Sequence, residues 1–157
     1  ILEKTPLESG GVYTSLMSYP DEEIFALVQA LSVLKNIPIN QILFDVGKKM
    51  IQVTAVEYPQ FFKGKNLKTF LKSVDQIIHS EVHKLFPNAD TPSFEVKEKK
   101  DSHWCMIYQS HRKLCRLAEG LITGASDYFQ EPIKLSQSAC YHRGDKACHI
   151  EIEFSHV

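Results

Sequence analysis

The sequence predicts an α+β fold in a single domain that spans residues 1–157. Apolar residues spaced three and four positions apart predict helices through the first half of the chain, and alternation of apolar and polar residues predicts strands after it. Helices that come first, followed by an antiparallel sheet with one crossing helix, are the layout of an α+β domain. The 157 residues, 43% of them hydrophobic, are enough for one globular core. The sequence contains no internal repeat and no linker that would divide it.

Two helices are predicted in the first fifty residues from their starts and breaks. A loop that contains proline and a glycine pair covers Thr5–Gly11. Asp21 is placed to cap the first helix, which has acidic residues in its first turn and runs to about Lys35. Pro38 ends this helix, because the residue before a proline avoids the helical conformation. The second helix is predicted for residues 40–50, and an aromatic turn follows it.

The longest predicted helix covers residues 66–85 and carries two histidines. Its apolar residues form one stripe at about 100° per residue: Leu67, Phe70, Leu71, Val74, Ile77, Ile78, Val82 and Leu85. His79 falls at the flank of this stripe, and His83 falls further round, toward the polar face. An imidazole at such an edge can ligate a buried heme iron while its second nitrogen keeps a polar partner. A core-edge histidine that bonds to a carbonyl is the alternative interpretation.

The second half of the chain predicts four strands and one helix. Residues 93–98 and 104–108 alternate between apolar and polar side chains, with a turn between them. Residues 113–129 return to helical spacing. Residues 133–140 and 147–154 alternate again around a turn that contains glycine, which predicts an antiparallel hairpin.

A second motif, Y-x-S-x-R, ends the run HWCMIYQSHR. In a strand, side chains alternate between faces, so Tyr108, Ser110 and Arg112 would share one face. Two hydroxyls and a guanidinium suit a pair of carboxylates, which arginine can bind through two parallel hydrogen bonds. The two propionates of heme are such a pair. A half-exposed strand with its polar residues outward is the alternative.

His79 and the Y-x-S-x-R motif, in this order, resemble the heme-nitric oxide/oxygen binding (H-NOX) family, which is related to the sensor domain of soluble guanylate cyclase. The resemblance runs from about Tyr13 to the C-terminus and includes SYPDEEIFALVQ, DQIIHSEVHKLF, YQSHR and AEGLITGASDYF. It looks closest to the bacterial stand-alone members. It implies an N-terminal helical part and a C-terminal part in which a curved antiparallel sheet packs on a long signalling helix, with heme between the two.

The resemblance also implies a role for each matched residue. His79 takes the position of the proximal ligand to the iron of heme b. Tyr108, Ser110 and Arg112 take the positions of the propionate partners. Pro92, thirteen residues after His79, matches the proline that presses on the heme and distorts it.

The distal side of the expected pocket has no polar partner for a bound gas. Oxygen-binding members hold a tyrosine where this chain has Leu117, and a second polar partner where it has Met50. Leu121 is expected to line the same pocket. Bound O₂ carries partial negative charge and needs a hydrogen-bond donor, whereas NO binds ferrous heme strongly without one. The resemblance therefore implies an NO sensor that excludes O₂.

Four cysteines suggest thiols or a metal site. Cys140 and Cys148 are symmetric about the glycine of the predicted hairpin, so they would face each other at a spacing that suits two zinc ligands or a disulfide. The resemblance implies a zinc site with Cys115 as third ligand and a histidine where Gln137 stands. Free thiols remain an alternative. The candidates for a replacement fourth ligand are His142, His149 and Cys105.

Composition excludes several classes of function. The net charge is −1 without a basic stripe, so a nucleic-acid partner is not expected. No apolar run approaches the roughly 18 residues of a membrane helix, and no signal peptide is visible. The cysteines without secretory context indicate a reducing, cytoplasmic setting. The chain starts at Ile1, its first residues ILEK resemble the end of a helix, and the family's first helix is therefore expected to be missing.

Three functions follow from these observations. The first is a heme b sensor that binds NO and CO and regulates a separate partner, which the family suggests is a histidine kinase or a cyclic-di-GMP enzyme. The second is a zinc- and thiol-based redox sensor on the same fold. The third is a sensor of apolar small molecules of the vinyl-4-reductase type. An enzyme is not expected, because the sequence has no nucleophile motif and no paired carboxylates with a shared site.

Overall fold

The computed structural model describes residues 1–2, 5–14 and 17–155. Part of the predicted helix end at ILEK, Glu3 and Lys4, lies outside the described residues. The chain divides into two compact units, Ile1–Leu43 and Phe44–Val157, each of which is described by itself.

The first unit contains α1 (Asp21–Lys35) and the loop before it. Pro20, not Asp21, takes the N-cap position, and no side chain caps this helix, so Asp21 is its first residue. Glu23 is buried and holds the preceding loop, because its carboxylate accepts hydrogen bonds from Ser9 N and Oγ at 2.7 and 2.6 Å and from the Tyr13 hydroxyl at 2.7 Å. The helix ends at Asn36, which adopts the left-handed conformation with φ 52°.

The division between the units falls within α2 (Ile39–Glu57), which is seven residues longer than predicted at its C-terminal end. Within the second unit, this helix packs closely on α5 (Cys115–Phe129). A Cβ atom at Gly47 would lie 2.4 Å from Leu117 O, and one at Gly120 would lie 2.1 Å from Phe44 O. Only glycine permits such close contact between two helix backbones.

The predicted long helix is present but is not regular. After a short 3-10 segment, η2 (Pro59–Phe61), it consists of α3 (Leu67–Ser73), the π-helical segment η3 (Val74–His79) and α4 (Ser80–Leu85). Asn66 and Thr69 form a capping box at its start, with Asn66 Oδ1 accepting from Thr69 N at 2.9 Å. A π segment has hydrogen bonds from i to i+5, so it shifts the residues after it around the helix axis. The apolar residues remain three and four positions apart through the π segment. The spacing therefore predicted one regular helix and could not reveal the π segment.

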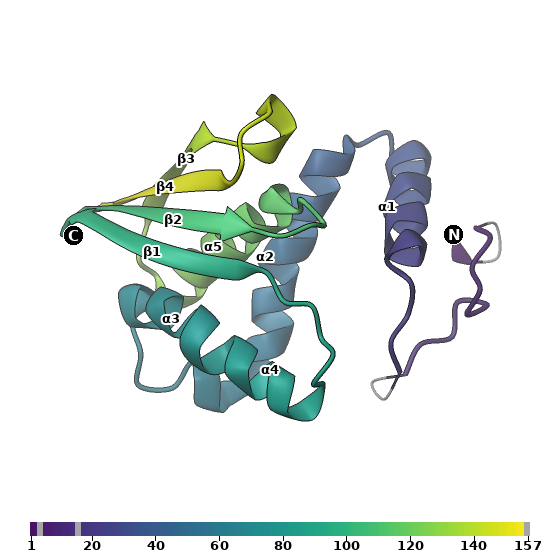
Figure 1. The fold of residues 1–157 in the computed structure, drawn as a ribbon, viewed down its shortest axis with the longest axis horizontal. Helices are drawn as coiled ribbons and strands as arrows, with labels where there is room; N and C mark the ends of the chain where they lie inside the picture. The colour runs from purple at the N-terminus through teal and green to yellow at the C-terminus, as the bar shows by residue number, and fades with distance from the viewer. Residues whose placement is uncertain (3–4, 15–16, 156–157) are drawn as a thin grey trace. The chain divides into compact units, whose positions relative to one another are not determined.

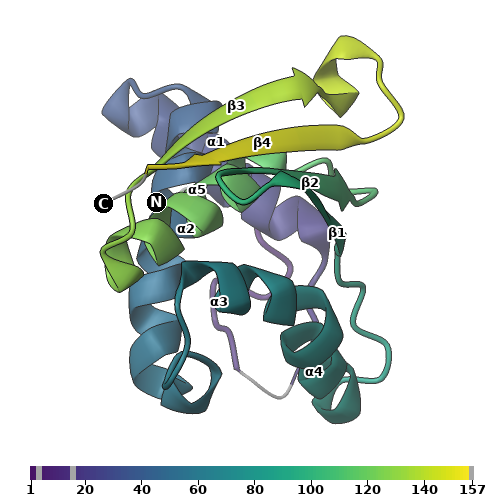
Figure 2. The same cartoon turned by 90° about the vertical axis from the view of Figure 1, so that its left-hand side faces the viewer.

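Four strands form one antiparallel sheet in the order β1-β2-β4-β3. They are β1 (Ser93–Lys100), β2 (His103–Gln109), β3 (Ile133–Ala139) and β4 (Cys148–Phe154), with η4 (Tyr141–Arg143) in the last hairpin. Within this unit, α5 and the α3–α4 helix lie on the same face of the sheet (Figures 1 and 2). The predicted α+β layout is confirmed.

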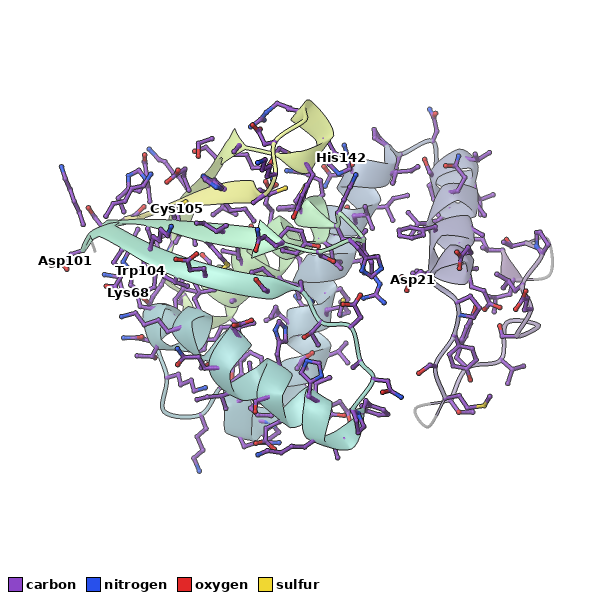
Figure 3. The ribbon with its side chains drawn as sticks, viewed as in Figure 1. Asp21, Lys68, Asp101, Trp104, Cys105 and His142 are labelled. Atoms are coloured by element: carbon purple, nitrogen blue, oxygen red, sulfur yellow. The ribbon has the colours of Figure 1, made fainter. Side chains whose placement is uncertain are left out.

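The core of the second unit lies between this face of the sheet and the helices that cover it. Leu67 and Ile152 are fully buried there, and Trp104 is 1% exposed. At one end, Lys68 Nζ donates to Asp101 O at 2.5 Å and lies 5.7 Å from the centre of the Trp104 ring. Figure 3 labels these three residues. The start of α3 is thereby fastened to the turn between β1 and β2. No helix among the described residues is long and apolar enough to cross a membrane.

Candidate functional site

A cavity of about 450 Å³ lies inside the second unit, bordered by α2, the α3–α4 helix, β1, β2 and α5. This volume is within the range of roughly 300–1,000 Å³ that is typical of cofactor and ligand pockets. Most of its walls are apolar. The polar side chains that line it are Thr54, His79, Tyr108, Ser110 and Arg112.

The eight residues expected at the heme pocket all line this one cavity: Met50, His79, Pro92, Tyr108, Ser110, Arg112, Leu117 and Leu121. They come from α2, η3, the loop before β1, β2, the turn after it, and α5. The fold therefore brings together residues that are up to 71 positions apart in the sequence. That each contacts heme remains a prediction.

His79 is the last residue of the π segment, and its side chain is 16% exposed. Its Nδ1 lies 3.4 Å from Asp75 Oδ1, and its ring centre lies 5.7 Å from that of Phe94. Burial lowers the pKa of His79 below its ordinary value, although the Asp75 carboxylate acts in the opposite direction. The neutral imidazole that results is the form that ligates a metal.

Asp75 is a site residue that the sequence analysis missed. The same Oδ1 atom that faces His79 also accepts a hydrogen bond from Phe94 N at 3.3 Å, so it connects the π segment to the start of β1. Carboxylates behind metal-ligating histidines fix the ring and its tautomer. The sequence did contain a signal for this contact, because Asp75 stands four residues before His79 and residues four positions apart are neighbours on a helix.

His83 does not line the cavity. Its Nε2 lies 2.9 Å from Thr91 Oγ1 in the loop before β1. Of the two histidines on this helix, the structure places only His79 where it could ligate a group in the cavity.

The alternation of side chains predicted that the whole Y-x-S-x-R motif lies on one strand, and this prediction is wrong. β2 ends at Gln109, and Ser110 and Arg112 lie in the turn that follows. They reach the same cavity as Tyr108 because this turn folds back. It is held by hydrogen bonds from Arg112 N to Ser110 Oγ at 3.2 Å and from Leu114 N to the Tyr108 hydroxyl at 3.0 Å.

Two polar groups of this motif differ in exposure. Tyr108 is buried, and this burial raises the pKa of its hydroxyl, which stays a neutral donor. The side chain of Arg112 is 28% exposed and contacts the loop before β1, where its Nη1 donates to Asp90 O at 2.5 Å and lies 3.4 Å from Asp90 Oδ2. A guanidinium at the edge of an apolar cavity can pair with the carboxylates of a cofactor whose body is buried.

The donor set of the cavity fits heme. One neutral imidazole, a nearby guanidinium with two hydroxyls, and apolar walls are the three features that a histidine-ligated heme with two propionates requires. Met50 on α2 and Leu117 and Leu121 on α5 carry no hydrogen-bond donor, and the hydroxyl of Thr54 on α2 already donates to Met50 O at 2.8 Å.

Comparison with known proteins decides the family. The sequence profile described as haem-NO-binding matches residues 1–137. The chain belongs to this family, the H-NOX domains. It is therefore a heme-binding gas-sensor domain and not an enzyme, as the sequence predicted.

Solved H-NOX structures share the fold over 99% of this chain. A triple mutant of an H-NOX protein from S. oneidensis in the Fe(II) state has a TM-score of 0.92 and 29% identity, with 83% of that chain covered. The unliganded Fe(II) protein from K. algicida has a TM-score of 0.88 and 28% identity, with 84% covered. A mutant of the T. tengcongensis protein has a TM-score of 0.87 and 26% identity, with 85% covered. No curated protein sequence matches the chain.

Three of the four cysteines form a cluster outside the cavity. The Sγ atom of Cys140 lies 3.7 Å from those of both Cys115 and Cys148, and the three sulfurs lie within 4.8 Å of one another. Cys140 directly follows β3, whose last residue Ala139 lies opposite His149, and Cys148 begins β4. The two cysteines therefore face each other across the hairpin, with their sulfurs 3.7 Å apart. The structure contains free thiols and no disulfide among its described residues.

The fourth zinc ligand that the prediction needed is not found. His142 Nε2 is 2.9 Å from Lys113 O. Cys105, labelled in Figure 3, belongs to β2 and is not one of the clustered cysteines. Among the described residues, the cluster offers three sulfur ligands and no histidine or carboxylate. A structural zinc site almost always has four protein ligands, so this donor set does not complete one.

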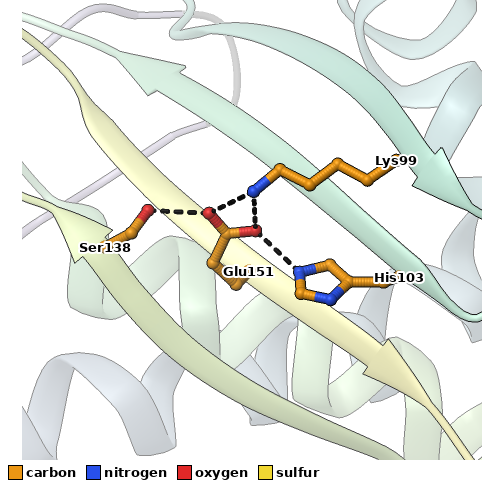
Figure 4. A network of polar contacts seen from close by, with 4 residues as sticks. All are labelled: Lys99, His103, Ser138 and Glu151. Atoms are coloured by element: carbon orange, nitrogen blue, oxygen red, sulfur yellow. Dashed lines mark hydrogen bonds and ion pairs between the residues drawn. The ribbon is translucent and has the colours of Figure 1, made fainter.

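A polar network on the other face of the sheet was also missed by the sequence analysis (Figure 4). Glu151 is 8% exposed, and its carboxylate accepts hydrogen bonds from Lys99 at 2.9 Å, Ser138 at 2.7 Å and His103 at 2.9 Å. Burial would raise the pKa of Glu151, but these three donors outweigh burial and lower it to about 2. The four residues come from the four strands, so the network fastens the whole sheet.

Proposed function

We propose that this domain binds ferrous heme b through His79, senses NO, also binds CO, and regulates a separate signalling protein. The observation that carries the proposal is that all eight expected pocket residues line one cavity with a single imidazole among its described lining residues. Heme, when bound, supplies the iron on which a diatomic gas binds.

Different residues of the cavity would bind different parts of the heme. His79 offers a neutral nitrogen, held from behind by Asp75. Tyr108, Ser110 and Arg112 offer donors to two carboxylates. The apolar walls exclude water, which favours retention of a flat apolar cofactor.

Preference for NO over O₂ is supported by the apolar character of Met50, Leu117 and Leu121. O₂ bound to iron needs a hydrogen-bond donor, and these side chains have none. Two related structures agree with NO and CO as ligands. The S. oneidensis H-NOX protein, 29% identical to this chain, has been solved in the Fe(II)NO and Fe(II)CO states.

The partner is proposed to be a histidine kinase or a cyclic-di-GMP enzyme, on the resemblance to stand-alone bacterial members. A cytoplasmic setting is proposed because the four cysteines are free thiols. A thiol redox sensor is the second candidate, and the three-cysteine cluster is the observation that favours it.

The test is the absorption spectrum of the reduced protein under argon, then air, then NO. We expect a strong Soret band under argon, the same spectrum in air before oxidation, and a shifted band with NO. A stable oxygen complex in air would contradict the proposed gas selectivity. Failure to bind added heme would contradict the function itself and favour the thiol sensor.

A further inference from the structure

The three-cysteine cluster is built like a ligand site. Cys115 begins α5, Cys140 follows β3, and Cys148 begins β4, so three separate elements bring their sulfurs together. Their exposed fractions are 1%, 4% and 0%. Sulfurs 3.7 Å apart are too distant for a disulfide and close enough to share one ion.

The side chain of Gln137 lies beside the cluster and has an unused donor. Its Nε2 atom is buried and has no hydrogen-bond partner among the described residues, although the amide lies next to the Cys115 thiol. An unsatisfied buried N–H costs free energy. A thiol sulfur is a weak acceptor, whereas a thiolate held by a metal accepts N–H hydrogen bonds well. The orphan donor is therefore explained if Cys115 is a metal thiolate.

The backbone supplies a second donor of the same kind. Tyr141 N donates to Cys148 Sγ at 3.4 Å. Gln137 also lines a second cavity of about 520 Å³ that is bordered by α5 and β3. The cluster thus has three sulfurs and two N–H groups beside them.

We propose that Cys115, Cys140 and Cys148 bind one monovalent thiophilic cation of the Cu(I) class in three-coordinate geometry, rather than zinc. Soft thiolate ligands select Cu(I), and three donors without a fourth do not meet the tetrahedral preference of zinc. Each thiol that becomes a ligand releases its proton to solvent, and no electron is transferred. Gln137, at the position where the zinc-type site would need a histidine, then donates to the Cys115 thiolate.

The test is a competition experiment with the reduced full chain under anaerobic conditions. Cu(I) is titrated against a chromophoric Cu(I) chelator, and Zn(II) against a chromophoric zinc chelator. We expect one equivalent of Cu(I) to be withheld from its chelator and zinc not to be withheld. Zinc withheld as strongly as Cu(I), or neither ion withheld, would overturn the proposal.

Two cysteine variants test whether the ion binds at the cluster. Cys140→Ser should abolish Cu(I) retention, whereas Cys105→Ser, which changes a buried cysteine outside the cluster, should keep it. Equal loss in both variants would contradict the assignment. Circular dichroism of each variant shows whether it is folded.

Gln137 provides a test that does not depend on removing a cysteine. Gln137→Leu keeps the shape and removes the orphan N–H, so Cu(I) affinity should fall about 10–100-fold, as for other groups that support a metal ligand. Gln137→His should supply the missing fourth ligand and let the protein withhold zinc. If Gln137→His withholds no zinc, or Gln137→Leu leaves Cu(I) affinity unchanged, the proposed geometry is wrong.

Discussion

Asp75 Oδ1 lies 3.4 Å from Nδ1 of His79, four residues later at the end of the π segment. The same oxygen accepts from Phe94 N at 3.3 Å, so the imidazole of the cavity is connected to β1 through one carboxylate. A movement of His79 away from Asp75 would lengthen this contact. Asp75 is therefore a positioning residue for the proposed ligand.

Asp75→Asn should weaken heme retention without removing the ligand. Loss of the carboxylate behind a metal-ligating histidine typically costs about 10–100-fold in affinity. The measurement is the rate of heme transfer to an apo-globin acceptor, together with the iron–histidine stretching frequency by resonance Raman, which should fall. Asp127→Asn is the control, since Asp127 pairs with Lys48 away from the cavity. An unchanged stretching frequency would remove Asp75 from this role.

His79→Gly should abolish five-coordinate, histidine-ligated heme, and added imidazole should restore it by filling the space left by the ring. His83→Gly is the matched control on the same helix. It should have little effect, because His83 contacts Thr91 and does not line the cavity. Absorption spectra of the two reduced variants show which of them has lost histidine-ligated heme. Loss of heme in the His83 variant with retention in the His79 variant would show that the ligand is misassigned.

Arg112→Leu should accelerate heme loss. Removing one partner of a desolvated charge pair costs on the order of 2–5 kcal/mol, and the partial exposure of Arg112 places the expected effect at the lower end. The heme-transfer rate should therefore rise at least tenfold. Arg143→Leu, which removes an exposed arginine outside the cavity, should leave the rate unchanged. Equal rates in the two variants would exclude Arg112 as a propionate partner.

Leu117→Tyr should create O₂ affinity by adding a hydroxyl donor to the α5 wall of the cavity. Leu117→Phe is the matched control, because it adds the same ring without the hydroxyl. We expect an oxygen complex in air only for the tyrosine variant, measured by absorption and by the rate of autoxidation. If the phenylalanine variant binds O₂ equally well, pocket size rather than hydrogen bonding controls selectivity.

Glu151 should make stability depend on pH in the acid range. Its pKa is lowered from 4.5 to about 2, so the folded state releases this proton more readily than the unfolded chain. The resulting stabilisation is fully present above about pH 4.5 and is lost as pH falls through 2. A shift of this size corresponds to roughly 3 kcal/mol at most.

Glu151→Gln removes this dependence while it keeps the shape of the side chain. Urea unfolding at several pH values should give a lower free energy of unfolding at pH 7 and a flatter profile between pH 5 and 2, relative to the unmutated protein. Glu153→Gln, at an exposed position on the same strand, is the control and should change neither. A Glu151→Gln profile as steep as that of the unmutated protein would show that other carboxylates dominate.

The element order was predicted from the sequence alone, and the resemblance carried by its motifs named eight residues that line the cavity. Apolar spacing reports local backbone geometry, so α1, α5 and the four strands were predicted within a few residues. The edge position of His79 followed from the same spacing, because a helix places residues three and four apart on one face.

Features that depend on contacts between distant residues could not be predicted from the sequence and are seen only in the folded structure. The π segment alters the helix register without disturbing its apolar stripe, and Asp75 reaches Phe94 across 19 positions. Glu151 meets Lys99 across 52 positions, and the sulfur of Cys140 meets that of Cys115 although the strand before it has already ended. Periodicity carries no information about such pairs, since they form only when separate elements pack and place particular side chains side by side.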